Sequence, residues 1–134
     1  MKKNNCRSNC PLSITLDIIG DKWSLLIIRD MIFMKKKYYG DFLNSSEKIA
    51  TNILSNRLKS LESHSFITKT KDSNNRSKFI YQLSKKGVDL FPILLEMILW
   101  GDKYNDNSSL PSEFIQKIKK DKDKMVHELL NSIN

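Results

Sequence analysis

The sequence predicts a mainly α-helical protein with one small β-hairpin, an α+β fold. Apolar residues recur at helical spacing along most of the chain. After His64 the pattern changes, because residues 66–71 and 78–83 carry strand-forming side chains on either side of the turn-rich residues 72–77. A helix pair therefore precedes a two-stranded hairpin, and this order predicts a winged helix-turn-helix domain.

The size and charge of the chain indicate which class of protein it belongs to. Its 134 residues correspond to one domain, and 40% of them are hydrophobic, which is enough for a modest core. Lys and Arg number 23 against 15 Asp and Glu, which gives a net charge of +8. Such a basic domain attracts polyanions, of which nucleic acid is the commonest. A basic protein without such a partner is the alternative.

Cysteine use and hydropathy favour the cytoplasm. The chain has two cysteines, too few for a disulfide framework. Its first residues are charged but lead into polar ones, without the apolar centre of a signal peptide. The most apolar stretch, residues 88–100, is too short and too polar to span a bilayer. We therefore expect a cytoplasmic protein without membrane attachment.

The N-terminal part predicts a flexible tail and two helices. Residues 1–9 are polar and are expected to be flexible. Pro11, a residue favoured at the first helical position, opens a helix that ends at Gly20. Asp21 then caps a second helix, residues 22–34, which is apolar on most sides and is therefore expected to lie at the centre of the core.

A short helical segment at residues 38–43 precedes a helix with two distinct faces. Thr51 caps this helix, which runs to His64. One face is apolar and consists of Ile53, Leu54, Leu58 and Leu61. The opposite face is polar, without acidic residues, and consists of Asn52, Ser55, Asn56, Lys59 and Ser63. A merely solvated helix would carry Glu and Lys there, so this face is a candidate binding surface.

The C-terminal half continues the helical pattern. Ser84 caps a long helix, in which Pro92 is expected to kink or loosen the first turns. Residues 101–111 form a linker rich in turn-forming residues, and Ser112 starts a last helix with an apolar stripe. The expected organisation is a tail at 1–9, a winged-helix DNA-binding domain at 10–104 that includes the long helix, and a linker with a C-terminal dimerisation helix at 105–134.

Three stretches together resemble a known family. They are Cys10-Pro11 followed by LDIIGDKW at 16–23, IATNILSNRLKSLE at 49–62, and YQLSKKG at 81–87 leading to Trp100-Gly101. In this order and spacing they resemble the HxlR family, a branch of the MarR-like winged-helix transcription regulators. The resemblance implies a cytoplasmic homodimer on a palindromic operator, with residues 51–64 as the recognition helix, 72–77 as the wing, and dimer contacts from the first and C-terminal helices.

A recognition helix needs one face for the core and one face of hydrogen-bonding groups for base edges. Asn52, Ser55 and Asn56, near the helix start, are suited to bases, and Lys59 is suited to phosphate. Basic residues of the hairpin are suited to phosphates or to an adjacent minor groove. The expected DNA-binding residues are Thr51, Asn52, Ser55, Asn56, Lys59, Lys71, Arg76 and Lys78. Arg57 is expected to have a structural or phosphate-binding role.

A single recognition helix reads too few base pairs for specific binding. Two-fold symmetry doubles the contacts and sets two such helices about 34 Å apart, one turn of B-DNA. The first helix and the stripe of the last helix, which includes Leu129 and Leu130, are surfaces that one domain cannot easily bury alone. The expected partners are double-stranded DNA and a second copy of the chain.

Cys10 is the candidate for sensing. It precedes Pro11 at the expected N-cap, where the helix dipole and nearby basic residues would raise thiol reactivity. Some HxlR proteins sense oxidants or electrophiles through a matching cysteine, so the resemblance implies redox sensing, with the partner subunit's Cys6 or Cys10 as the second thiol. A buried packing residue is the alternative. Neither histidine is obviously close to Cys6 and Cys10, so no metal site is expected.

Other functions stay open as alternatives. Trp23, Phe91, Met97 and Trp100 are candidates to line a pocket for a small apolar effector, although such spacing usually marks core residues. A winged helix can also bind protein partners, but such a surface would show apolar or acidic residues where this chain has Asn, Ser and Lys. The sequence has no Gly-rich phosphate loop, nucleophile elbow or acid–His pair, so we expect neither an enzyme nor a cofactor.

Overall fold

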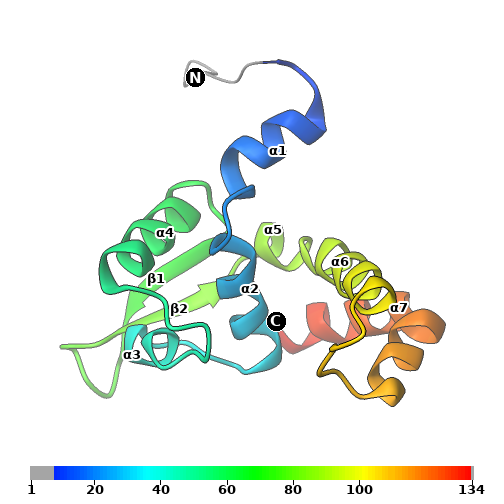
Figure 1. Cartoon of the computed structure of the whole chain (residues 1–134). Helices are drawn as coiled ribbons and strands as arrows, with labels where there is room; N and C mark the ends of the chain where they lie inside the picture. Colours follow the sequence, from blue (N-terminus) through cyan, green and yellow to red (C-terminus); the bar gives the residue numbers. More distant parts are fainter. Residues whose placement is uncertain (1–7, 134) are drawn as a thin grey trace.

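A computed structural model describes residues 8–133 and confirms the mainly helical winged helix-turn-helix fold. Figure 1 shows α4 and the hairpin on one side of α2, α6 and α7 on the other, and α1 projecting away from this body. The elements are α1 (Pro11–Ile19), α2 (Ser24–Phe33), α3 (Tyr39–Leu43), α4 (Thr51–Ser63), β1 (Ile67–Lys71), β2 (Phe79–Leu83), α5 (Lys85–Val88), α6 (Phe91–Tyr104) and α7 (Ser112–Ile133). Predictions for residues 1–7, Cys6 included, fall outside the described residues.

α2 begins two residues later than the sequence predicts. The expected first residue is Lys22, whereas the helix starts at Ser24. The Asp21 carboxylate accepts the backbone N–H groups of Trp23 and Ser24, at 2.9 and 3.0 Å, and this holds a turn in front of the helix. Asp21 therefore satisfies the first N–H groups, as a capping residue does, but from outside the helix.

α4 ends in a Schellman motif. Ser65, just beyond the helix, has a positive φ of 65°. The Ser65 N–H donates to the Glu62 carbonyl at 3.0 Å, and the Phe66 N–H donates to the Leu61 carbonyl at 2.9 Å. Leu61 and Phe66 are both buried, which is the apolar contact that accompanies this motif. The chain thereby reverses from α4 into β1.

β1 and β2 form an antiparallel two-stranded sheet in which Ile67 lies opposite Leu83. Each strand starts one residue later than predicted. Ile67 and Tyr81 are buried, and the Tyr81 N–H donates to the Lys37 carbonyl at 2.8 Å, which ties β2 to the segment before α3. The hairpin thus packs on the helices, as two isolated strands require for stability.

The long helix predicted after Ser84 is in fact two helices, α5 and α6. Ser84 caps α5 as expected, because its hydroxyl accepts the Gly87 N–H at 3.1 Å. Pro92 lies in the first turn of α6, where its missing N–H needs no helical partner. In one continuous helix that position would have to donate to the Val88 carbonyl, so Pro92 separates two helices instead of kinking one.

α7 packs along α6 and is interrupted once. Asp121 has a non-helical backbone, with φ −127° and ψ 31°, and divides the helix in two. Ile118 before this break and Leu129 after it are buried in the core of the same chain. The sequence places Leu129 at a subunit interface, so its burial within the chain is a correction. The linker before α7 is also shorter than predicted, because α6 continues to Tyr104.

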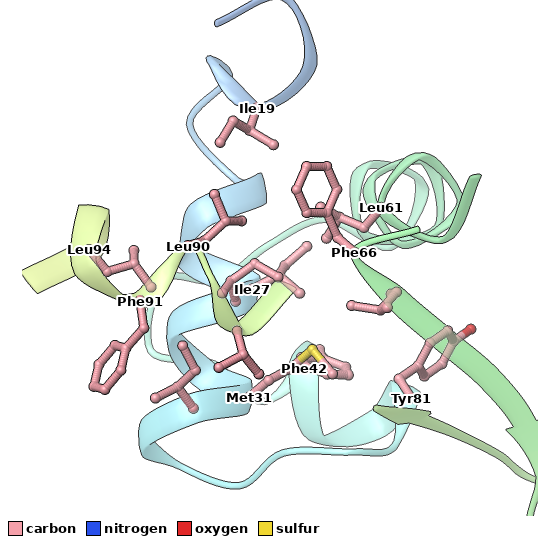
Figure 2. Close-up of a cluster of buried hydrophobic side chains, with 14 of the residues drawn as sticks. Ile19, Ile27, Met31, Phe42, Leu61, Phe66, Tyr81, Leu90, Phe91 and Leu94 are labelled. Carbon is pink, nitrogen blue, oxygen red and sulfur yellow. The ribbon is translucent and has the colours of Figure 1, made fainter. Parts of the chain in front are cut away.

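One core joins α2, α3, α4, the hairpin and α6, and Figure 2 shows side chains from these elements converging on it. Ile28 of α2 is 0% exposed, and Met31 of the same helix is buried beside it. Phe42 of α3 meets Tyr81 of β2 edge to face, with the ring centroids 6.2 Å apart. Burial of these apolar groups is the main force that holds the elements together. It fixes the orientation of α4, and hence which of its faces meets solvent.

Candidate nucleic-acid interface

α4 presents one face to the core and one face to solvent. The buried face consists of Leu54, Leu58 and Leu61, each at most 2% exposed, with Ile53 half-buried. The opposite side, here called the polar face of α4, consists of the exposed residues Thr51, Asn52, Ser55, Asn56 and Lys59. The structure therefore brings together all five residues that the sequence proposes for this helix.

Tyr39 of α3 holds the start of α4. Thr51 is the first helical residue and not the predicted N-cap, because Ala50 occupies the N-cap position with an extended backbone. The Tyr39 hydroxyl donates to the Thr51 carbonyl at 3.1 Å and lies 3.0 Å from the Ser55 Oγ. Since the Tyr39 proton is used by that carbonyl, Ser55 donates to the Tyr39 oxygen. Ser55 keeps its lone pairs available to accept from a ligand.

The two asparagines of the polar face have different surroundings. Within residues 8–133 the Asn52 side chain makes no hydrogen bond, so its oxygen and its nitrogen are both available. The Asn56 Oδ1 accepts from the Arg57 Nε at 2.9 Å and from the Arg57 Nη2. Arg57 also lies beside Asp21, with 3.3 Å between Nη1 and Oδ1. Of the two roles expected for Arg57, structural or phosphate-binding, these contacts favour the structural one.

Hydrogen bonds to Asp72 and Asn75 shape the loop between the strands. The Asp72 carboxylate accepts the Asn74 N–H at 3.0 Å and the Tyr38 hydroxyl at 2.8 Å. The Asn75 Oδ1 accepts the N–H and the hydroxyl of Ser77, at 3.2 and 2.6 Å. The loop is thus ordered by its own side chains, and Tyr38 connects it to the segment before α3.

The Tyr38–Asp72 contact shifts the titration of both groups. The Asn74 N–H and the Tyr38 hydroxyl stabilise the carboxylate and lower the pKa of Asp72 below its usual value. The hydrogen bond to Asp72 raises the pKa of Tyr38 above its usual value. At neutral pH the pair is therefore a neutral phenol donating to a carboxylate, which keeps the base of the loop in place.

The hairpin carries the three exposed cations expected from the sequence, which are Lys71, Arg76 and Lys78. The Lys78 Nζ lies 5.2 Å from the centre of the Tyr38 ring. On β1, the Lys69 Nζ lies 4.3 Å from the centre of the Phe79 ring. An aromatic ring beneath a cation favours its position without neutralising its charge. These ammonium groups are therefore held on the surface and can still pair with phosphate.

An open cavity of about 840 Å³ lies between the polar face of α4 and the hairpin. Its lining includes the cations Lys59, Lys69 and Lys78 and the acids Asp41 and Glu62. The cations outnumber the acids, and two of them come from the hairpin while the third comes from α4. A concave basic surface of this kind suits a phosphate-bearing strand that passes between helix and hairpin.

Three residues of this surface are not identified from the sequence, namely Tyr38, Tyr39 and Lys69. A signal for the tyrosines exists, because they directly follow the lysines at 35–37, and aromatic residues next to basic ones are typical of nucleic-acid-binding surfaces. Lys69 offers no such signal. It belongs to the cavity because α4 packs beside β1 and α3 beside β2, which only the fold reveals.

Cys10 lies on α1, away from the polar face of α4. It is the N-cap of that helix and is exposed, so it is not the buried packing residue of the alternative interpretation. Its N–H donates to the Ser8 Oγ at 3.1 Å. Leu12 and Leu16 of the same helix are 67% and 53% exposed. The helix that Cys10 caps therefore carries apolar side chains that are more than half exposed.

A second exposed apolar surface runs along α6. Met97, Trp100 and Tyr104 are 55%, 69% and 66% exposed. Met97 and Trp100 line a shallow apolar depression there, whereas Trp23 lines a separate small cavity beside α4. Phe91 is buried in the core. The four residues considered for an effector pocket therefore do not line one common pocket.

The described histidines and acids do not gather into a metal site. Within residues 8–133, no three His, Cys, Asp or Glu side chains are placed to hold a metal ion together. His64 is the C-cap of α4, and its Nδ1 lies 2.9 Å from the Ser60 carbonyl oxygen. No helix in this part of the chain has both the length and the apolar character needed to cross a membrane.

Known proteins resemble this chain in sequence and in structure. YdzF, a helix-turn-helix-type transcriptional regulator of Bacillus subtilis, is 34% identical over 97 residues, which cover 72% of this chain and 89% of YdzF. The redox regulator HypR in its oxidised form has a TM-score of 0.64 and 30% identity, covering 72% of this chain and 99% of HypR. The reduced form of the transcriptional regulator YodB from B. subtilis has a TM-score of 0.59 and 25% identity, covering 76% of this chain and 100% of YodB.

A family model identifies the shared part of the molecule. Residues 18–109 match the model of the HxlR-like helix-turn-helix, a span that contains α2 to α6 and both strands. This span is more than half of the chain and includes the polar face of α4 and the hairpin. The family and the relatives are transcriptional regulators and not enzymes. The chain therefore belongs to the HxlR-like helix-turn-helix family of transcriptional regulators.

Proposed function

We propose that this regulator is a cytoplasmic homodimer that binds a palindromic operator in double-stranded DNA, with α4 as the recognition helix. The polar face of α4 is the observation that supports this most strongly. Its five side chains are exposed, none is acidic, and the buried leucines behind them hold the helix rigidly. Asn52, Ser55 and Asn56 would meet base edges in the major groove.

The hairpin acts as the wing and binds the sugar–phosphate backbone. Lys71, Arg76 and Lys78 are exposed on it, and Lys59 of α4 lines the same basic cavity as Lys78. Contacts of this kind position a protein on the duplex without reading its sequence. The wing therefore supplies most of the affinity for DNA, and α4 supplies the discrimination between bases.

Pairing of two chains is supported by the exposed apolar surfaces of α1 and α6. Leu12 and Leu16 project from α1, while Met97 and Trp100 project from α6, and all are more than half exposed. A two-fold pair would bury both surfaces at once. It would also set two copies of α4 about 34 Å apart, which matches one turn of B-DNA. A contribution from residues 105–134, expected from the sequence, stays a prediction.

Selection of bound DNA from a random pool under reducing conditions tests this proposal. We expect an enriched palindrome whose half-sites are centred about 10 base pairs apart, because two symmetric helices enter successive major grooves on one side of the duplex. Enrichment of one unrepeated half-site would contradict the dimer. A pool that is retained without any enriched sequence would contradict specific recognition.

We further propose that Cys10 controls DNA binding in response to oxidants or electrophiles. Its exposure at the start of α1, beside the apolar surface of that helix, supports this role. The structural relative HypR is a redox regulator, and YodB has been crystallised with a bound quinone. Two thiols would give two protons and two electrons to an oxidant such as diamide and form a disulfide between subunits. That bond would shift α1, and with it the spacing of the two recognition helices.

Operator release after diamide treatment tests the role of Cys10. We expect the wild type to lose operator affinity on treatment and to regain it after reduction with dithiothreitol. Cys10→Ser is expected to stay bound, because it lacks the thiol that reacts. Cys6→Ser shows whether the second thiol is the partner subunit's Cys6 or Cys10. Equal release of wild type and Cys10→Ser would exclude Cys10 as the switch.

A further inference from the structure

The hydrogen bonds around Asn56 determine which way its amide faces. The Asn56 Oδ1 accepts from the Arg57 Nε at 2.9 Å and from the Arg57 Nη2. A guanidinium carries donors only, so the Asn56 atom that faces it must be the carbonyl oxygen. The amide nitrogen of Asn56, with two N–H donors, is therefore the atom left for a ligand.

The Arg57 side chain is held in place by Asp21, which lies between α1 and α2. Its Nη1 lies 3.3 Å from the Asp21 Oδ1, and both side chains are largely covered, at 26% and 28% exposure. Asp21 is itself fixed by the N–H groups of Trp23 and Ser24 and by the Ser24 hydroxyl, which donates at 2.6 Å. The guanidinium therefore bridges a fixed carboxylate and the Asn56 oxygen before any DNA is bound.

We propose that Arg57 is a positioning residue that makes Asn56 a donor-only reader and so selects guanine over adenine at one position of each half-site. The inference rests on the proposed function, because it requires α4 to lie in the major groove. There guanine presents two acceptors, N7 and O6, whereas adenine presents the acceptor N7 beside the N6 donor. An asparagine binds adenine with both amide atoms. With its oxygen occupied, Asn56 satisfies guanine but leaves the adenine amino group without an acceptor.

Asn52 provides a comparison within the same helix. It lies one turn before Asn56 on the polar face, and in the described part of the chain its side chain makes no hydrogen bond. Both amide atoms of Asn52 are thus available, and it can bind an adenine edge in bidentate fashion. Two asparagines on adjacent turns are therefore expected to read different bases, and Arg57 is the cause of the difference.

Base preference at each half-site position tests this inference. Full-length protein is titrated against operator duplexes that carry each of the four base pairs at every position, and Asn56→Ala identifies the position that Asn56 reads. We expect guanine there in the wild type. Arg57→Met keeps an unbranched side chain but removes the donors, and it is expected to lower the guanine-over-adenine preference about tenfold. The preference at the Asn52 position is expected to stay unchanged.

A double variant separates positioning from a general structural effect. If Arg57 acts through Asn56, Arg57→Met changes no base preference in the Asn56→Ala background, whereas a structural effect would still appear there. If Arg57→Met does not fold, Arg57→Lys replaces it in this test, because lysine keeps a positive charge opposite Asp21 but lacks the planar guanidinium. A smaller change in the same direction is expected for the lysine variant.

The outcomes distinguish this inference from the proposed function. Adenine preferred at the Asn56 position in the wild type, or an unchanged preference in Arg57→Met, would overturn the inference while leaving DNA binding intact. A wild type without any base preference would contradict the proposed function and, with it, the guanine selection. The Arg57 Nε–H resonance of the free protein tests the hydrogen bond independently of DNA: solvent exchange slowed in the wild type but not in Asn56→Ala supports this bond, and equal exchange overturns it together with the inference.

Discussion

Asp21 connects the start of α2 to the polar face of α4. Burial acts to raise the pKa of Asp21, but hydrogen bonds from the Ser24 hydroxyl and from the N–H groups of Ser24 and Trp23, together with the charge of Arg57, outweigh it. The pKa of Asp21 is therefore lowered below its usual 3.8. Because the folded state binds this proton less readily than the unfolded state, the ionised carboxylate stabilises the fold.

Substitution of Asp21 by Asn is expected to change the dependence of stability on pH. The stabilisation by the carboxylate is complete above about pH 5 and is lost as the pH falls through 3.8 toward the lower pKa of the folded state. Asp21→Asn should therefore be less stable than the wild type at neutral pH, with a difference that shrinks below about pH 4. Urea unfolding from about pH 7 to about pH 3 measures this. A difference that is constant with pH would contradict the assignment.

Single residues of the candidate site differ in how far the sequence determines them. Asn52 is predictable as an exposed residue, because helical spacing alone places it opposite the buried leucines. The link from Asn56 through Arg57 to Asp21 is not predictable in this way, since Asp21 lies in another turn of the chain and meets α4 only after α2 packs. The contact of Tyr39 with α4 depends on packing for the same reason.

The end of α4 contains a serine in a conformation that favours glycine. Ser65 has φ 65°, and the two hydrogen bonds of the Schellman motif require this conformation. A side chain with a Cβ costs roughly 1–2 kcal/mol in the left-handed region. The motif is retained because it turns the chain from α4 into β1 and buries Leu61 and Phe66. A substitution of Ser65 can therefore stabilise the C-terminal end of α4.

Ser65→Gly is expected to raise the free energy of unfolding by up to about 1 kcal/mol, because glycine adopts positive φ without the steric cost but loses more conformational entropy on folding. Ser63→Gly, inside the last turn of the same helix, is the matched control and is expected to lower it by roughly 0.5–1 kcal/mol. Urea denaturation of both variants measures the two effects. Equal destabilisation by the two substitutions would show that Ser65 carries no strain.

The elements that the sequence predicts well are those set by local patterns. The period change after His64 identifies the hairpin, and Ser84 is confirmed as a cap. The helix boundaries that differ from the prediction have tertiary or steric causes. Asp21 stabilises a turn, so α2 begins two residues later than predicted, and Pro92 starts a new helix inside the predicted long one. Leu129 is apolar at the expected spacing, but spacing alone cannot say whether its own chain or a second chain covers it.

At the scale of the whole molecule, α7 and α1 differ in how much of their apolar surface their own chain covers. α7 buries Ile118 and Leu129 within its own chain. α1 projects from the body with Leu12 and Leu16 exposed, as Figure 1 shows for the helix itself. Apolar surface of this kind, together with that of α6, is characteristic of an interface between subunits. The proposed dimer therefore depends on α1 and α6.

Trp100→Glu is expected to convert the proposed dimer into monomers. Trp100 is 69% exposed on α6, so the substitution removes interface area and adds charge without disturbing the core. Light scattering after size exclusion should give twice the chain mass for the wild type and the chain mass for the variant. Met34→Glu, at an exposed apolar residue at the end of α2 and outside the proposed interface, is the control and should stay dimeric. A monomeric wild type would contradict the proposed dimer.

The affinity of Asn52→Ala for two duplexes tests base reading by α4 most directly. The wild type and the variant are titrated with the selected operator and with a scrambled duplex, and Arg76→Ala serves as a wing variant for comparison. Asn52→Ala is expected to lose about 1–3 kcal/mol on the operator and nothing on the scrambled DNA. Arg76→Ala is expected to weaken binding to both duplexes and to lower the salt slope by about 0.9. If Asn52→Ala loses equal affinity on the two duplexes, or none on either, α4 does not read the bases through this residue.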